Sequence, residues 1–206
     1  NNLKTLPDRE YKCGLGELVK YTLLGAEWDL ELGDSFFEFV SAHVDEILAK
    51  DEAVLNQIID HCLRIKAGIV SQDEREKGIR AHLNLGHTFG HALEELTKYQ
   101  RYSHGEAVAI GIVCSCYLSE ELGYFKPANT EAVIELMTRL GLDYKLPDDI
   151  SIDDMIAAFK YDKKAEAGKA KFILPKATIG NVEVVPNLGE DLVRSAMRRN
   201  QLLPSS

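Results

Sequence analysis

Residues Gly78–Leu96 read GIRAHLNLGHTFGHALEEL, and this stretch decides the fold. Its apolar residues recur at helical spacing, which predicts a helix with one apolar face formed by Leu85, Phe89, Ala92, Leu93 and Leu96. Gly86 and Gly90 are expected inside this helix, where each is less favourable than alanine by about 1 kcal/mol. Such glycines are expected where another backbone or a ligand comes close.

Polar side chains form a second stripe on the same predicted helix. Arg80, Asn84, His87 and His91 fall at positions i, i+4, i+7 and i+11, so they share one face. A solvated helix face is the alternative, but such faces usually carry Lys and Glu, whereas these side chains coordinate and orient ligands. The stripe therefore predicts a helix that packs on one side and faces a polar cavity on the other.

Working outward, helical periodicity extends from about residue 15 to about residue 139, with breaks at Gly25 and near residues 50–51, 72–78, 98–103 and 123–128. Two short strand-like runs flank Pro175 and Gly180-Asn181, which predicts a small β-hairpin near residues 171–185. Residues 190–200 return to helix. The predicted fold class is mainly α, a multi-helix bundle that forms a single domain over residues 1–206.

Composition excludes several classes of protein. The chain has 206 residues, 45% hydrophobic and 28% charged, which is typical of an ordered globular domain. Its net charge of −9 offers no broad positive field, so nucleic acid is not an expected partner. No run approaches the roughly 18 apolar residues of a membrane helix, and the start is neither a signal peptide nor an initiator methionine. We expect a cytoplasmic protein with no membrane contact that is a piece of a longer chain.

The cysteines follow no disulfide or zinc-knuckle spacing. All four lie in apolar stretches and are predicted to be reduced core thiols: Cys13, Cys62, Cys114 and Cys116. A metal or redox pair at Cys114 and Cys116 is disfavoured, because residues two apart on a helix point in different directions.

A third histidine is expected close to the first two. Ser103 and Glu106 are spaced as a capping box, which places His104 at the first position of a helix. The partial positive charge of that helix end disfavours the imidazolium form, so the ring keeps a lone pair for a metal.

Charged residues also occur amid apolar neighbours. Glu17 and Lys20 stand three apart on one helix face, where they form either a simple intrahelical salt bridge or part of a site. Lys66 lies in an apolar stripe, and it either extends outward along its stem or lines a cavity.

Two or three histidines and a carboxylate on one helical bundle match a catalytic zinc site, in which open positions remain for substrate or water. Arg80, Lys20 and Lys66 add positive charge suited to an anionic, phosphorylated substrate. Spacing leaves open whether His87 and His91 both bind the metal or only one does.

These residues lie in segments that resemble the C-terminal domain of the 3-dehydroquinate synthase family. The run LNLGHTFGH, from Leu83 to His91, is highly specific. The similarity spans nearly the whole chain, through residues 6–10, 14–21, 64–67, 73–76, 80–94, 104–108, 162–164 and 172–174.

The resemblance implies a Zn²⁺ or Co²⁺ ion held by Glu17, His87 and His104, with His91 contacting substrate instead. It implies substrate binding by Lys20, Lys66, Arg80, Asn84, His91 and Lys163, with Lys164 as the alternative inward lysine. It also implies catalytic roles for His91, Lys20 and Asn84.

The implied activity is that of a phosphate-eliminating carbon–oxygen lyase of the shikimate pathway, which supplies chorismate and the aromatic amino acids. The family converts 3-deoxy-D-arabino-heptulosonate 7-phosphate to 3-dehydroquinate and phosphate by transient oxidation with NAD⁺, elimination, reduction and aldol closure. The family's N-terminal dinucleotide-binding half is absent from this sequence. We therefore expect NAD⁺ to be bound mainly by that half and the fragment alone to be inactive. The family also suggests a homodimer.

Two other interpretations remain. One is another sugar-phosphate cyclase, or a metal-dependent polyol dehydrogenase, of the same superfamily. The other is a non-catalytic helical binding module, which predicts that no metal is bound.

Overall fold

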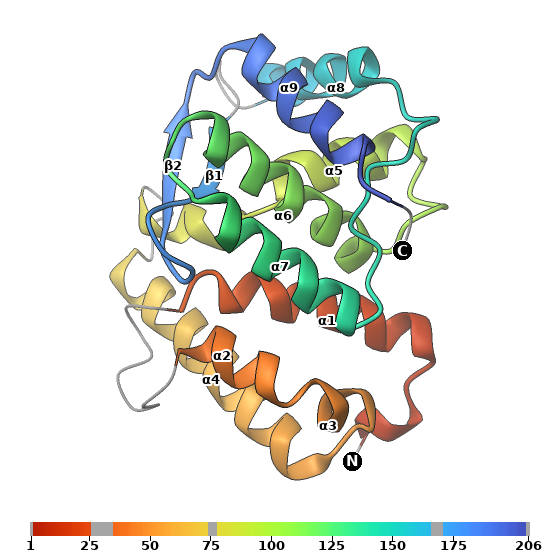
Figure 1. Cartoon of the computed structure of the whole chain (residues 1–206), viewed down its shortest axis with the longest axis vertical. Coiled ribbons are helices and arrows are strands. Elements are labelled where there is room, and N and C mark those ends of the chain that lie inside the picture. The colour runs from red at the N-terminus through yellow and green to blue at the C-terminus, as the bar shows by residue number, and fades with distance from the viewer. Residues whose placement is uncertain (1, 26–34, 74–77, 166–170, 205–206) are drawn as a thin grey trace.

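The computed structural model describes residues 2–25, 35–73, 78–165 and 171–204, without the side chains of residues 2 and 160–165 (Figure 1). Its elements are η1 (Asn2–Thr5), α1 (Asp8–Thr22), α2 (Phe36–Ala42), α3 (Val44–Leu48), α4 (Glu52–Gln72), η2 (Ile79–Asn84), α5 (His87–Leu96), α6 (His104–Glu121), α7 (Pro127–Arg139), α8 (Ile152–Ala165), β1 (Lys171–Pro175), β2 (Val182–Pro186) and α9 (Glu190–Gln201). The prediction of a mainly α fold with a small hairpin is confirmed.

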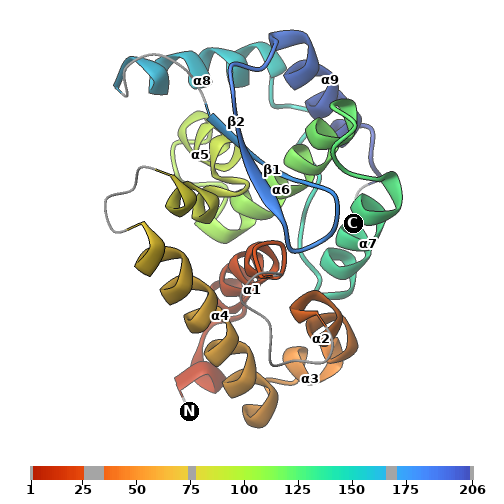
Figure 2. The ribbon, with the colours of Figure 1, turned by 90° about the vertical axis from the view of Figure 1, so that its left-hand side faces the viewer.

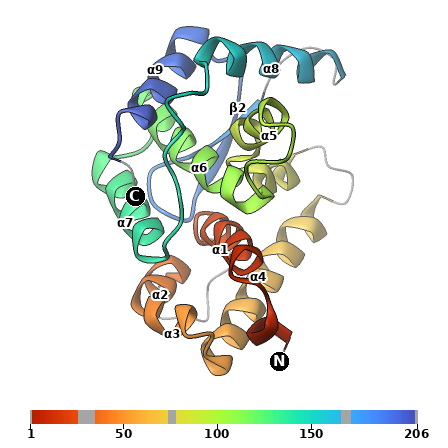
Figure 3. The same cartoon turned by 90° about the vertical axis from the view of Figure 1, so that its right-hand side faces the viewer.

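Helix α6 is the centre of the fold. Apart from its two ends and Glu106, its residues are buried from Gly105 to Ser119. A helix that is apolar on all sides must be covered on all sides, and α6 contacts α1, α5, α7, α9 and β1. Helix α1 lies between two groups of helices, with α5, α6 and α9 above it and α2, α3 and α4 below it (Figures 1 and 3). The elements that surround α6 therefore come from both ends of the chain.

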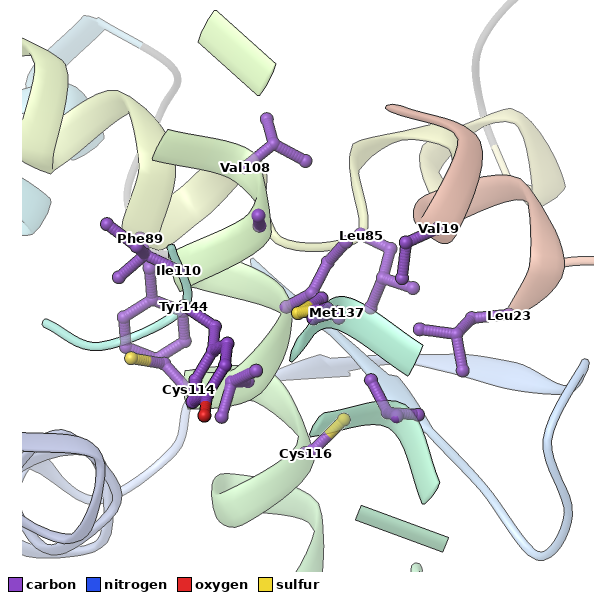
Figure 4. Packing of buried hydrophobic residues seen from close by; sticks show 14 of the residues in the cluster. Val19, Leu23, Leu85, Phe89, Val108, Ile110, Cys114, Cys116, Met137 and Tyr144 are labelled. Carbon is purple, nitrogen blue, oxygen red and sulfur yellow. The ribbon is translucent and has the colours of Figure 1, made fainter. Parts of the chain in front are cut away.

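Side chains from distant segments meet around α6 (Figure 4). Val19 comes from α1, Leu23 directly follows that helix, Phe89 comes from α5 and Met137 from α7, and each is at most 1% exposed. Cys114 and Cys116 of α6 are completely buried between them, which raises the pKa of both thiols.

All four cysteines are free thiols. The prediction of core thiols is confirmed for Cys114 and Cys116, whereas Cys13 and Cys62 are only partly buried.

Two glycines let neighbouring backbones touch α6. A Cβ atom on Gly111 would lie 2.0 Å from the Gly86 carbonyl oxygen, and one on Gly105 would lie 1.9 Å from the Cys13 carbonyl oxygen. No Cβ atom fits at such distances, so the start of α5 and the middle of α1 approach α6 through glycine alone. This approach fixes where α1, α5 and α6 lie relative to one another.

The prediction of one continuous helix through residues 80–96 is wrong. The chain forms the 3-10 helix η2, breaks at Leu85 and Gly86, and starts α5 at His87. Gly86 has φ +78°, and a Cβ atom there would also lie 2.8 Å from the Val108 carbonyl oxygen. Packing against α6 thus demands a left-handed residue without a side chain, and this demand overrides the helical periodicity.

The C-terminal part covers α6 from the other side. Strands β1 and β2 pair antiparallel, with Lys171 opposite Pro186 and Pro175 opposite Val182, and β1 contacts α6 (Figure 2). The Ser119 hydroxyl of α6 donates to the Pro175 carbonyl oxygen. The hairpin and the final helix are confirmed, while α8 lies in a region for which the periodicity predicted no helix.

None of the described helices combines the length and the apolar character needed to span a bilayer.

We expect Gly111→Ala to lower the free energy of unfolding by at least about 2 kcal/mol, because the new methyl group collides with backbone rather than with a movable side chain. Gly14→Ala is the matched control: Gly14 lies inside α1, and a methyl group added there would meet none of the described residues beyond its own helix within 4 Å. Alanine at this position should therefore raise stability by about 0.5–1 kcal/mol. Urea titration followed by circular dichroism measures both. Equal effects of the two substitutions would contradict the close approach.

Candidate metal centre

Glu17 uses its two carboxylate oxygens for different neighbours. It lies in the middle of α1, where Oε2 accepts a hydrogen bond from Lys20 Nζ at 2.5 Å. Oε1 lies 3.4 Å from His104 Nε2 and 3.8 Å from His87 Nε2. One carboxylate therefore joins a lysine on its own helix to two histidines from α5 and α6.

Three imidazole rings gather at this point. The ring centroids of His87 and His104 are 5.0 Å apart, those of His87 and His91 are 5.3 Å apart, and those of His91 and His104 are 6.0 Å apart. His87 and His104 are the first residues of α5 and α6, so the close approach of these helices sets the spacing of their rings. The Ser103 backbone N–H donates to Glu106 at 2.6 Å, as the predicted capping box requires.

Hydrogen bonds define which nitrogen of His87 and of His104 carries the proton. His87 Nδ1–H donates to the Leu85 carbonyl oxygen at 3.0 Å, since a carbonyl can only accept. His104 Nδ1 lies 3.3 Å from a carboxylate oxygen of Glu94 and donates to it in the same way. In the neutral rings the lone pairs are then on the Nε2 atoms, which both face Glu17.

Burial keeps His87 neutral. Loss of solvent is the largest influence, and with the nearby charges of Lys20 and His104 it lowers the pKa of His87 to about 4, against the opposing effects of the Leu85 carbonyl and Glu17. At neutral pH the ring therefore offers a lone pair rather than a second N–H.

The three atoms that converge here fit a cation. Glu17 Oε1 is buried and accepts no hydrogen bond from any residue that the structure describes. It faces two nitrogen lone pairs, and three acceptors repel one another unless a positive charge lies between them. Ligands of a tetrahedral zinc ion, each about 2.0–2.1 Å from the metal, stand roughly 3.3 Å apart, close to the separations seen here. Glu17, His87 and His104 thus offer one carboxylate and two imidazoles, a ligand set suited to Zn²⁺ or Co²⁺.

A cavity of about 360 Å³ opens beside Glu17, between η1, α1 and α4. Its lining is mostly apolar, and Glu10, Glu17 and Lys66 are its charged members. Lys66 is exposed and lines this cavity, so both alternatives that the sequence left open hold in part. Burial is the main cause that raises the pKa of Tyr21 and of Cys62, two further lining residues, to about 12.

The remaining predicted site residues belong to three elements, which are α5, η2 and α8. His91 is exposed and belongs to the imidazole cluster. Arg80 and Asn84 belong to η2, which leads into α5 and is not continuous with it, so they do not share one helical stripe with the histidines. The side chains of Lys163 and Lys164 lie outside the described residues.

Glu94 is a residue that the sequence analysis missed. Its side chain is 8% exposed and contacts His104. The signal was present, because Glu94 follows His87 by seven residues and His91 by three, and so extends their stripe on α5.

Comparison with known proteins shows the family to which the chain belongs. The family model "3-dehydroquinate synthase C-terminal" matches residues 14–165. A 3-dehydroquinate synthase from Desulforamulus reducens is 40% identical over 188 residues, which cover 91% of this chain and 50% of that protein. The chain thus spans about half the length of the curated relatives it matches.

Solved structures show the same fold. ValA, a 2-epi-5-epi-valiolone synthase from Streptomyces hygroscopicus subsp. jinggangensis 5008 with NAD⁺ and Zn²⁺ bound, superposes with a TM-score of 0.81 at 23% identity, over 96% of this chain and 52% of ValA. A 2-deoxy-scyllo-inosose synthase complexed with carbaglucose-6-phosphate, NAD⁺ and Co²⁺ gives a TM-score of 0.75 at 23% identity, over 95% of this chain and 53% of that one.

The chain therefore has the fold of about half of each of these two synthases. By sequence, the chain belongs to the 3-dehydroquinate synthase C-terminal family.

We expect the stability of the metal-free chain to fall between about pH 7 and pH 4, in part because His87 takes up a proton more readily in the unfolded state. The folded pKa lies below the unfolded value of 6.5, so the unfolded state binds more protons in this range and gains stability as the pH falls. His87→Asn keeps a donor for the Leu85 carbonyl but does not titrate. Urea unfolding of both proteins should therefore show a shallower pH dependence for the variant, and equal slopes would contradict the assignment.

Proposed function

We propose that this chain is the metal- and substrate-binding part of a 3-dehydroquinate synthase. The proposed reaction, a carbon–oxygen lyase step followed by ring closure, converts 3-deoxy-D-arabino-heptulosonate 7-phosphate to 3-dehydroquinate and phosphate. The observation that carries the proposal is the convergence of Glu17, His87 and His104 around a buried carboxylate oxygen without a hydrogen-bond partner among the described residues. Membership of the family, at 40% identity to a named synthase, supports the choice of reaction.

Glu17, His87 and His104 would hold the metal ion. When bound, the ion supplies Lewis-acid polarisation of a substrate hydroxyl, and NAD⁺, bound mainly by an N-terminal half, supplies the hydride acceptor. The related ValA structure has NAD⁺ and Zn²⁺ bound, which supports the same pair of cofactors here.

Lys20 contributes a fixed positive charge beside the metal ligands. Its side chain is 5% exposed and its Nζ atom is held by Glu17 Oε2 at 2.5 Å, so little reorganisation accompanies binding of an anionic group. Lys66 lines the adjoining cavity and, in the proposal, binds the phosphate or carboxylate of the substrate together with Arg80 and Lys163.

His91 is the proposed proton carrier. Its exposed ring lies beside His87 and His104 but is not needed to complete the ligand set, which leaves its nitrogens available to substrate or water. Asn84, exposed at the end of η2, would orient the substrate by hydrogen bonding. Loss of general acid–base assistance lowers turnover by about 10²–10⁴-fold.

The larger protein is proposed to be a cytoplasmic homodimer in which residues 1–206 form one of two domains. The chain's half-length coverage of its relatives supports the second domain.

The first test is metal content. We expect about one Zn²⁺ per chain, and at least about 100-fold weaker binding for Glu17→Ala, His87→Ala and His104→Ala, because each removes one of three ligands. His61→Ala is the control, since it removes a histidine of α4 that packs against Phe36. Elemental analysis after dialysis measures all five proteins, and a binding module without chemistry predicts no zinc in any of them.

The second test is turnover in a protein that carries both halves. We expect phosphate release from 3-deoxy-D-arabino-heptulosonate 7-phosphate with NAD⁺, none from the 206-residue chain alone, and a kcat about 10²–10⁴-fold lower for His91→Ala with unchanged metal content. Sedoheptulose 7-phosphate and glucose 6-phosphate are the competing substrates. Faster turnover of either would assign the protein to another sugar-phosphate cyclase, and normal turnover by His91→Ala would remove the proton-carrier role.

A further inference from the structure

Glu94 occupies a place that the proposed reaction does not use. It lies near the end of α5, and its carboxylate is almost buried, with 8% of the side chain exposed. Oε1 lies 3.3 Å from Nδ1 of His104. Burying a carboxylate is unfavourable unless it is paired. The pairing of Glu94 with one ring nitrogen of His104 therefore calls for an explanation.

His104 is the ligand that packing holds least. Its side chain is 43% exposed, against 12% for His87. His87 is mostly covered and its ring is fixed by the Leu85 carbonyl oxygen, whereas His104 lies at the exposed first position of α6. The contact with Glu94 is the counterpart of the Leu85 contact: each fixes the Nδ1 atom and leaves Nε2 pointing at Glu17.

We propose that Glu94 is a positioning residue for the metal centre, which holds the His104 ring in the orientation and the tautomer that present Nε2 beside Glu17. A carboxylate that accepts from the outer nitrogen of a ligand histidine orients the ring and raises its basicity. The inference rests on the proposed metal site and extends it to a residue outside the ligand set.

The same residues permit one competing arrangement. His91, Glu94 and His104 also bring ligand atoms within 4.8 Å of one another, as a second metal site would. That site and the Glu17 site both require His104, and a neutral imidazole has a single lone pair. With Nε2 directed at Glu17 and Nδ1–H at Glu94, the positioning role is the one that the geometry favours.

The experiment measures Zn²⁺ affinity by chelator competition, and metal stoichiometry, for the 206-residue chain and its Glu94→Ala and Glu94→Gln variants. We expect one ion per chain in all three, about 10–100-fold weaker binding for Glu94→Ala, and a smaller loss for Glu94→Gln, whose amide oxygen still accepts from Nδ1–H. Glu95→Gln is the matched control, because Glu95 is the neighbouring but exposed carboxylate of α5. Circular dichroism of the metal-free proteins verifies that each variant is folded.

Each other outcome has a defined meaning. Affinity of a folded Glu94→Ala within about twofold of the parent overturns the positioning role. Because His104 can serve only one of the two sites, one ion in the parent and in Glu17→Ala, with none in either Glu94 variant, replaces it with the second metal site. If the parent binds no zinc, the metal centre itself fails, and the positioning role fails with it.

Discussion

Backbone contact of α6 with α1 and with the start of α5 is the constraint on which the rest of the structure depends. Gly111 meets the Gly86 carbonyl, and Gly105 meets the Cys13 carbonyl, at distances that exclude any side chain. The second contact lies one helical turn from Glu17, and the first lies beside His87. The same contacts that close the core therefore bring the carboxylate of α1 to the first residues of α5 and α6.

The break before α5 has a chemical consequence. Had residues 80–96 formed one helix, the Leu85 carbonyl would have accepted a bond from the helix backbone four residues later, in the ordinary pattern. Because the chain turns at Gly86 instead, that carbonyl accepts from the His87 side chain and fixes its Nδ1 proton. The left-handed glycine thus serves the packing of α5 on α6 and the tautomer of a proposed ligand at once.

Periodicity predicted the elements that local sequence determines. The hairpin, the final helix and the start of α6 at His104 were found because strand alternation, turn residues and a capping box are all encoded within a few residues. The break at Gly86 was not found, since its cause lies in Val108 and Gly111, more than twenty residues away. Helix α8 was missed although its signal is local, because Ile152, Met155, Ile156 and Phe159 recur at helical spacing directly after Ser151.

The sequence predicted some residues of the candidate site and missed Glu94, because the contact of Glu94 with His104 depends on the folded chain. Residue types and a resemblance placed Glu17, His87 and His104 in one ligand set, and the structure brings their ligand atoms together. Neither the residue types nor the resemblance distinguished Glu94 from Glu95, yet Glu94 is buried and Glu95 is exposed. Which carboxylate faces His104 follows from the phase of α5, and that phase is set by where the helix begins. The turn at Gly86 therefore determines the position of His87, a proposed ligand. It also determines the position of Glu94, which is proposed to hold the His104 ring.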